Sequence, residues 1–121
     1  MSELAGESIE ALVGRYAAAA TIHGRATEQS DYEEGNAAHE VISSVYRELR
    51  RRGLGAQRAL LELLSDPEPG VRSWAASHAL EFSPSDGEPM LSELASRPKS
   101  LLSFSAKMAL KQWQDGKLRF P

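Results

Sequence analysis

The 121-residue sequence contains no cysteine. This absence excludes disulfides, thiolate zinc sites and cysteine nucleophiles together. No apolar run approaches the ~18 residues that a membrane span requires. The first residues carry Glu3, Glu7 and Glu10 in place of the positive flank of a signal peptide, so no export segment is predicted. We therefore expect a cytoplasmic protein that does not bind membranes.

What the sequence does contain is typical of an ordinary soluble globular protein. Hydrophobic residues make up 41% of the chain and charged residues 26%. A chain of this length buries roughly two-thirds of its unfolded surface when it folds. We therefore expect a single domain over residues 1–121.

The net charge of −3 hides four alternating blocks. The balance is −6 over residues 1–40, +4 over 41–60, −6 over 61–96 and +5 over 97–121. Such blocks are usually solvated helix faces that attract one another in the fold. A DNA-binding chain more often shows one continuous basic surface and a high pI, whereas this pI is about 5.6. Nucleic acid is therefore not the partner that the charge favours.

Apolar residues recur at steps of three and four, which predicts helices, and no stretch alternates with the period of a strand. The predicted helices span about 7–26, 30–52, 59–65, 71–82, 88–96 and 100–114. Ser30 and Glu33 have the spacing of a capping box at the start of the second helix. Gly53 is predicted to end that helix. The helices group into pairs over about 7–53, 57–82 and 87–114, with a short tail at 115–121.

An internal repeat gives these pairs an order. Shifting the chain by 30 residues aligns 59–80 with 89–110. The identical positions are Leu61/Leu91, Leu64/Leu94, Ser73/Ser103, Ala76/Ala106, Ala79/Ala109 and Leu80/Leu110. Nearly all are apolar or small, as expected when each pair buries its face on the next. Trp74 and Phe104 also match, so both are predicted to lie in the core. The repeat predicts an all-α fold in which three helical hairpins stack into a short right-handed α-solenoid.

The repeat carries a resemblance to a known family. Residues 60–66 (LLELLSD) followed by 71–76 (VRSWAA) resemble a HEAT repeat. The wider span, from Tyr32 and Asn36 through residues 48–53 (ELRRRG) to Trp113 and Gly116, resembles a bacterial family of short HEAT-like proteins, domain of unknown function 2019. The resemblance covers about residues 30–118 and implies an all-helical solenoid with no established activity.

Asp66 and Arg72 are expected to have a structural role. The last repeat has Ser96 and Leu102 at these positions, so the acid and the base are absent together. The simplest explanation is that the two side chains form an ion pair across the turn between the helices. Losing one would leave the other as an unpaired, partly buried charge, which is costly.

The histidines are the residues best suited to chemistry. His78 aligns with Met108 and His23 lies on an apolar stripe, so both are expected to pack. Asn36, His39 and Glu40 could gather on one helix flank as an enzyme or metal site. However, no two histidines are spaced i, i+4 and no H-E-x-x-H motif is present. We therefore predict no enzyme, no catalytic residues, no cofactor and no metal.

The repeat register predicts a row of surface charges instead. It places Arg47, Ser77 and Lys107 in one row, and it places Arg51, Glu81 and Lys111 in the row one turn further on. In HEAT-like stacks these second helices line the concave side. The rows are either a ladder of exposed ion pairs or a groove that takes an acidic segment of a partner protein, with a phosphate backbone as a further occupant.

These observations favour a non-enzymatic protein–protein interaction module whose partner is unknown. By analogy of size and charge, it could resemble an immunity protein or antitoxin. The alternative is a nucleic-acid-binding HEAT-like protein, for which the only concentrated basic run is Arg47, Arg50, Arg51, Arg52 and Arg58. Three repeats are close to the minimum for a stable solenoid, so a homodimer is also considered.

Overall fold

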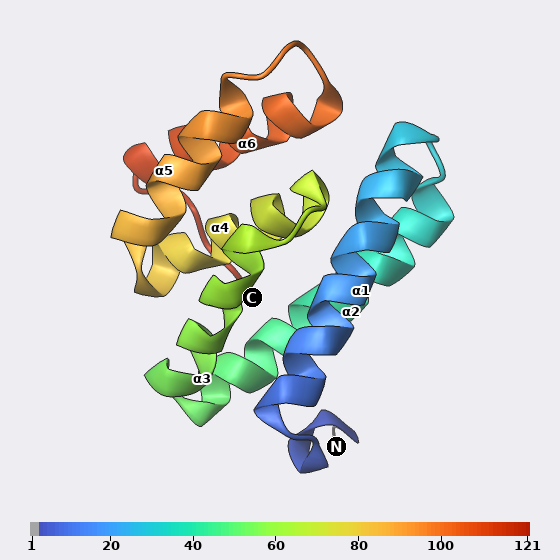
Figure 1. Cartoon of the computed structure of the whole chain (residues 1–121), viewed down its shortest axis with the longest axis vertical. Helices are drawn as coiled ribbons and strands as arrows, with labels where there is room; N and C mark the ends of the chain where they lie inside the picture. Colours follow the sequence, from blue (N-terminus) through green and yellow to red (C-terminus); the bar gives the residue numbers. More distant parts are fainter. Residues whose placement is uncertain (1–2) are drawn as a thin grey trace.

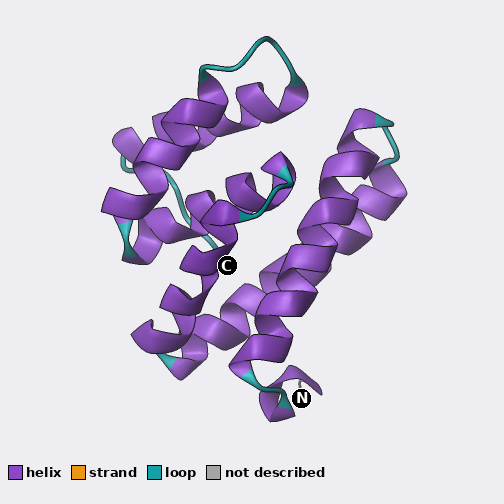
Figure 2. Ribbon diagram, in the orientation of Figure 1, coloured by secondary structure: helices purple, strands orange, loops and turns teal. Residues whose placement is uncertain are grey.

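The chain is built from α-helices, as the spacing of its apolar residues predicts. The computed structural model describes residues 3–121, which contain no strand (Figure 2). The α-helices are α1 (Ile9–Glu28), α2 (Tyr32–Arg52), α3 (Leu54–Arg58), α4 (Pro69–Phe82), α5 (Pro84–Ala95) and α6 (Leu101–Gln114), and the 3-10 helices are η1 (Glu3–Gly6) and η2 (Ala59–Ser65). Within this described part, no helix is long and apolar enough to cross a membrane.

The start of α2 differs from the predicted capping box. Asp31, and not Ser30, is the N-cap, and its side chain accepts a hydrogen bond from the Glu34 amide at 3.1 Å. Ser30 has a φ of 57°, in the left-handed region. It belongs to the turn that ends α1, where the Asp31 amide donates to the Ala26 carbonyl at 2.8 Å. Since an N-cap residue needs an extended backbone, Ser30 is unable to cap α2.

The prediction that α2 ends at Gly53 is confirmed, because this glycine has a φ of 109°. The starts of the third and fifth helical segments differ from the predicted ones. The third helical segment begins directly afterwards at Leu54, and it becomes a 3-10 helix before it ends at Ser65. The fifth helix begins at Pro84 and not near residue 88, since proline is favoured in the first turn, where its missing N–H has no intrahelical partner.

Two clusters of buried side chains form the core. The first joins α1, α2, α3, η2 and the first half of α4, and its fully buried members include Tyr16, Ile42, Leu49 and Leu60. The second joins α4, α5 and α6 through Ala76, Leu80, Leu91, Leu94 and Ala106. Leu64 packs against both. The two clusters therefore meet at η2 and α4.

The prediction that Trp74 and Phe104 both lie in the core is confirmed only for Trp74. Trp74 is partly buried against the first cluster, whereas Phe104 is 61% exposed. The prediction for Phe104 is wrong because the repeat position is buried only where a neighbouring helix pair covers it. No further helix pair covers the outer face of α6 in the described residues (Figure 1).

The residues after α6 return across the molecule. Gly116, with a φ of 72°, reverses the chain, and the amides of Lys117 and Leu118 both donate to the Gln112 carbonyl, at 2.8 and 3.2 Å. The segment then runs back to the middle of the molecule, where it ends beside α4 (Figure 1, red). This segment, residues 117–121, is called the tail below.

Candidate binding groove

The end of the tail lies in a hollow between three helices. Beside the tail, about 250 Å³ of this hollow is open, and the open space together with the place that the tail occupies is called the tail groove. Its lining residues are His39, Ser43, Tyr46 and Arg47 of α2, Trp74 and His78 of α4, Gln112 of α6, and residues 118–121 of the tail. These three helices are the second members of the predicted pairs. The register therefore predicted which helices share a surface.

Phe120 and the main chain around it hold the tail in the groove. The Phe120 ring lies 4.4 Å from the His78 ring and 6.0 Å from the Tyr46 ring, measured between centroids. Arg50 donates to the Phe120 carbonyl oxygen at 3.3 Å and also to the main-chain oxygen of Pro121. The groove therefore holds an extended segment by one aromatic side chain and by its carbonyl groups.

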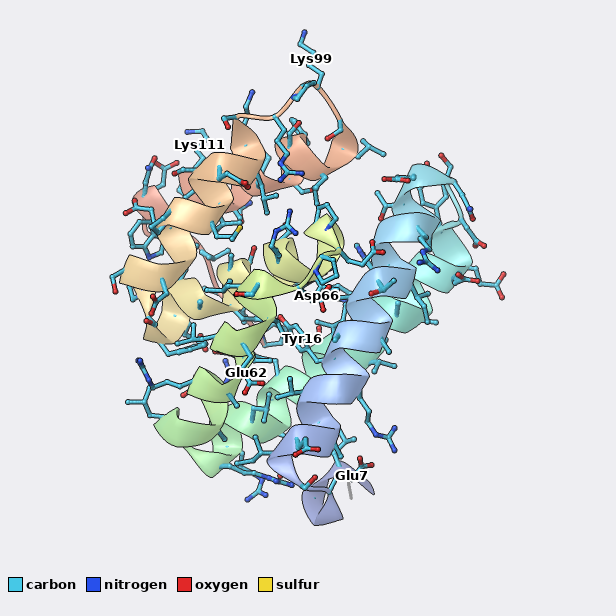
Figure 3. The ribbon with its side chains drawn as sticks, viewed as in Figure 1. Glu7, Tyr16, Glu62, Asp66, Lys99 and Lys111 are labelled. Atoms are coloured by element: carbon cyan, nitrogen blue, oxygen red, sulfur yellow. The ribbon has the colours of Figure 1, made fainter. Side chains whose placement is uncertain are left out.

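The floor of the groove is a buried aromatic stack. The ring of His78 lies parallel to that of Tyr46, with centroids 3.9 Å apart. Tyr16 points from α1 toward α4 (Figure 3), and a hydrogen bond of 2.6 Å joins its hydroxyl to Nδ1 of His78. Burial, together with the charge of Arg50 and with His39, lowers the pKa of His78 to about 3. The His78 ring is therefore neutral at pH 7, and it offers Phe120 an uncharged surface.

Tyr46 links this floor to a charged pair at the edge of the groove. Its hydroxyl donates to the Glu81 carboxylate and accepts a hydrogen bond from Gln57 Nε2 at 3.0 Å. Glu81 also pairs with Arg50 at 3.4 Å, and the Arg50 guanidinium lies 5.5 Å from the centre of the Tyr46 ring. Burial, and then the hydrogen bond to Glu81, raises the pKa of the Tyr46 hydroxyl. Glu81 and Tyr46 together fix the guanidinium that holds the tail.

Trp74 brings the three histidines into one cluster. Its ring lies 5.2 Å from His23, 5.4 Å from His39 and 5.8 Å from His78. Its Nε1 donates to His23 Nδ1 at 3.3 Å. Burial, and the neighbouring His39, lowers the pKa of His23. The prediction that His78 packs in the core is confirmed, since it is 2% exposed.

A second cleft lies on the other side of Trp74. Its volume is about 460 Å³, and it is bounded by α1, α4 and the start of α6. His23 and Trp74 form part of its wall, and Leu101, Leu102 and several hydroxyl side chains complete it.

The predicted ladder of charges does not form. Arg51 pairs with Glu48 at 2.6 Å on its own helix, while Glu81 takes Arg50 as its partner. Lys111 pairs with Asp115 at 3.1 Å, one turn further along α6. The prediction is wrong for Arg51 because the nearer acid, Glu48, lies three residues away on the same helix face.

The other predicted row is also divided. Arg47 lines the tail groove, where its guanidinium donates to Ser44 Oγ at 3.3 Å. Lys107 is exposed on α6, and within residues 3–121 its side chain makes no hydrogen bond or ion pair. Of the five residues predicted to bind a partner, only Arg47 lines the groove directly, and Glu81 contributes through Arg50.

Asp66 and Arg72 are connected, but not as an ion pair. Arg72 donates to the main-chain oxygen of Asp66 at 2.7 Å. The Asp66 carboxylate instead accepts a hydrogen bond from the Glu68 amide at 2.9 Å, ahead of α4. The predicted side-chain pair is therefore wrong, because the short turn gives each group a closer main-chain partner.

The residues considered as an enzyme or metal site lie on the exposed surface of α2. Asn36, His39 and Glu40 are all exposed on α2, and only His39 lines the tail groove. Among the residues that the structure describes, no three His, Asp or Glu side chains are placed to hold a metal ion.

The basic run is largely neutralised by the chain itself. Arg52 binds Glu48 at 2.7 Å and the Leu4 carbonyl oxygen at 2.9 Å. Glu48 accepts from both Arg51 and Arg52, and these hydrogen bonds lower its pKa to about 2. Arg50 pairs with Glu81, so three of the five arginines of the run form ion pairs within the described residues.

The fold and the groove define an all-α protein in which α2, α4 and α6 share a surface that accepts an extended segment. The chain belongs to the family described as Domain of unknown function (DUF2019), whose model matches residues 10–114. This confirms the resemblance found in the sequence. The fold is similar to the crystal structure of the protein RPA1889 from Rhodopseudomonas palustris CGA009, with a TM-score of 0.90 and 24% identity over 98% of each chain. No protein with a curated description matches the chain.

Only part of this groove could have been found in the sequence. The register brings α2, α4 and α6 together, but Trp74 and His78 were predicted only as packed core residues of α4, and no role was predicted for Tyr46. The tail has no periodic pattern, so nothing predicts its return. Two signals were available: the helix-ending Gly116 and the isolated Phe120 beyond it.

Proposed function

We propose that this protein is a non-enzymatic protein-interaction module, which binds an extended segment of a partner protein in the tail groove. The observation that carries the proposal is that the groove already holds such a segment. Phe120 packs on His78 and Tyr46, and Arg50 binds the adjoining carbonyl groups. A surface that holds an extended segment of its own chain has the contacts needed for a similar segment from another.

We further infer that the helices stack as three HEAT-like hairpins of a short right-handed α-solenoid. The contacts of α1 with α4, and of α4 with both α5 and α6, support this inference. In that arrangement α2, α4 and α6 would line the concave side, which is where solenoid proteins commonly bind partners.

The charges around the groove favour a particular kind of partner. Arg47 lines the groove and Arg119 of the tail adds a second cation, so the surroundings favour an acidic segment. The immunity or antitoxin analogy instead implies an acidic face that covers a basic toxin site, and the groove gives that form of the proposal less support. The nucleic-acid alternative also has less support, because Arg50, Arg51 and Arg52 are paired within the chain.

Affinity capture from native lysate, followed by mass spectrometry, tests the proposal when it is done with matched variants. Ser43→Trp fills the tail groove, whereas Ser92→Trp places the same side chain on the exposed surface of α5. We expect a protein that is captured by the wild-type chain and by Ser92→Trp, and that is lost with Ser43→Trp. A wild-type chain that captures no protein, or a partner that Ser43→Trp retains in full, would contradict the proposal.

A further inference from the structure

The tail groove has room for more than the tail. Resting on the proposed function, we propose that the partner segment carries an aromatic side chain directly preceded by a carboxylate. We further propose that the tail is a resident competitor, which this segment displaces. Three observations carry the proposal: the site that holds Phe120, the weak attachment of the tail, and the charge of the space left beside it.

The aromatic requirement follows from the floor of the groove. His78 and Tyr46 present stacked, uncharged rings, and Phe120 contacts both of them. Aromatic rings prefer tilted or edge-on contacts of this kind at centroid distances of about 4.5–7 Å. Arg50 is held beside the floor by Glu81 and meets the carbonyl groups of whichever segment lies there. An aromatic residue in an extended main chain reproduces all of these contacts.

The main chain of the tail is weakly attached, although Leu118 and Phe120 pack against the two core clusters and Arg50 binds two of its carbonyl oxygens. The Lys117 and Leu118 amides bond to the Gln112 carbonyl, but they belong to the turn that ends α6. Beyond Leu118, no main-chain amide of the tail donates a hydrogen bond to the described chain. Gly116, with its φ of 72°, forms the turn that separates the segment from α6. Displacing residues 119–121 would therefore break no main-chain hydrogen bond of α6 or of its turn.

The charge of the tail is poorly matched to the groove. Beside the tail, about 250 Å³ remain open next to His39, Ser43 and Arg47. The Arg47 guanidinium pairs with no carboxylate in residues 3–121, and Arg119 adds another positive charge to the same lining. Arg119 itself binds only the Leu118 carbonyl, at 2.7 Å. A carboxylate in place of Arg119 would complement Arg47, where the tail opposes it.

Binding of synthetic peptides to the full-length chain tests these points. The probes are fluorescein-labelled KLRFP, which has the sequence of the tail, KLEFP, which replaces its arginine with glutamate, and KLESP, which also lacks the aromatic ring. Fluorescence anisotropy at low salt compares the wild-type chain with Phe120→Ser, which weakens the resident tail. Phe104→Ser is the matched control, because Phe104 is 61% exposed on α6.

We expect Phe120→Ser to bind KLEFP at least tenfold more tightly than either the wild-type chain or Phe104→Ser, since an occupied site reduces apparent affinity by the fraction that is free. KLESP should not bind. With the Phe120→Ser chain, KLEFP should bind more tightly than KLRFP. Arg47→Gln added to that chain should weaken KLEFP about two- to fivefold, the range of an exposed ion pair, and should not weaken KLRFP.

Each part of the proposal has a result that would overturn it. Equal binding of KLEFP by the wild-type and Phe120→Ser chains would overturn the competition, and equal affinity for KLEFP and KLRFP would overturn the carboxylate. Duplex DNA that competes with KLEFP at low salt would overturn the protein partner in favour of nucleic acid. If no peptide binds but Ser43→Trp still abolishes partner capture, this inference fails and the proposed function stands. If Ser43→Trp has no effect on the partner, both fail.

Discussion

His78 makes the stability of the fold sensitive to mild acid. Burial lowers its pKa to about 3 in the folded chain, against an ordinary value near 6.5 in the unfolded chain. Between these values the unfolded chain binds one more proton at this site than the folded chain does. Stability therefore rises with pH through this window, and it is lost as the pH falls below about 6.5.

The size of the effect follows from the two pKa values. Each pH unit within the window is worth about 1.4 kcal/mol, so a change from pH 7 to pH 5 should remove roughly 2 kcal/mol of folding free energy. His23 acts in the same direction, because its pKa is also lowered. Against a typical total of about 5–15 kcal/mol, this loss is readily measured.

Urea unfolding at pH 7 and pH 5 measures this loss. We expect the free energy of unfolding of the wild-type chain to fall by roughly 2 kcal/mol between pH 7 and pH 5. For His78→Gln the loss that remains should come from His23, and any loss beyond that contribution should be less than about 0.5 kcal/mol. The variant should be less stable at pH 7, because it lacks the stack on Tyr46. His39→Gln, which changes an exposed imidazole of the same cluster, should keep most of the pH dependence. If His78→Gln lost as much stability as the wild-type chain, the assignment to His78 would be refuted.

Three further predictions concern the fold. Gly87→Ala places a Cβ 2.5 Å from the Ala76 carbonyl oxygen and should lower the free energy of unfolding, measured by chemical denaturation, by about 1–3 kcal/mol. Gly14→Ala, with open space around it, is the control and should raise that free energy by about 0.5–1 kcal/mol. A Gly87→Ala variant as stable as the wild-type chain would contradict the packing of α5 on α4. Asp66→Ala should lower the free energy of unfolding by about 1 kcal/mol, because the hydrogen bond from the Glu68 amide is lost. A double-mutant cycle with Arg72→Gln should show a coupling energy below about 0.5 kcal/mol, and a larger value would indicate a side-chain ion pair. Glu48→Gln should lower the melting temperature at pH 7, and at pH 3 the variant and the wild-type chain should differ less. The reason is that the pKa of Glu48 is lowered to about 2, so the stability that its carboxylate contributes is lost as the carboxylate is protonated. An unchanged melting temperature at pH 7 would contradict this role.

Much of the fold could be predicted because helical periodicity and turn residues act locally. The limits of α6 follow from Ser100 and the apolar steps after it, and α4 ends at Phe82 as predicted but begins at Pro69, two residues before the predicted start. The errors arose where two local preferences competed. Ser30 has the spacing of an N-cap, but it lies in the turn that ends α1, and the left-handed backbone that this turn requires prevents it from capping α2. Phe104 has the repeat position of a core residue, but within residues 3–121 no helix covers it.

The groove could be predicted only as far as the helices that form it. Which acid a surface arginine meets depends on side-chain reach, and Glu48 is closer to Arg51 than Glu81 is. The meeting of His23, His39 and His78 around Trp74 depends on how the helix pairs cross. Apolar spacing gives no measure of that angle. The return of the tail depends on contacts between Phe120 and residues more than 40 positions away in the sequence.

The central claim is that an extended aromatic segment binds between α2, α4 and α6. A nitrogen–proton NMR titration of the full-length Phe120→Ser chain with KLEFP tests it most directly. The two tryptophans provide internal reporters, because Trp74 lines the groove and Trp113 packs in the second cluster. We predict large shifts of the Trp74 indole resonance and of amides around Ser43 and His78, with Trp113 nearly unchanged. Trp74 lines the second cleft as well, so Ser43 and His78, which line only the tail groove, separate the two sites. Shifts confined to α5, or to Trp74 and the cleft bounded by Leu101, with Ser43 and His78 unaffected, would contradict the account.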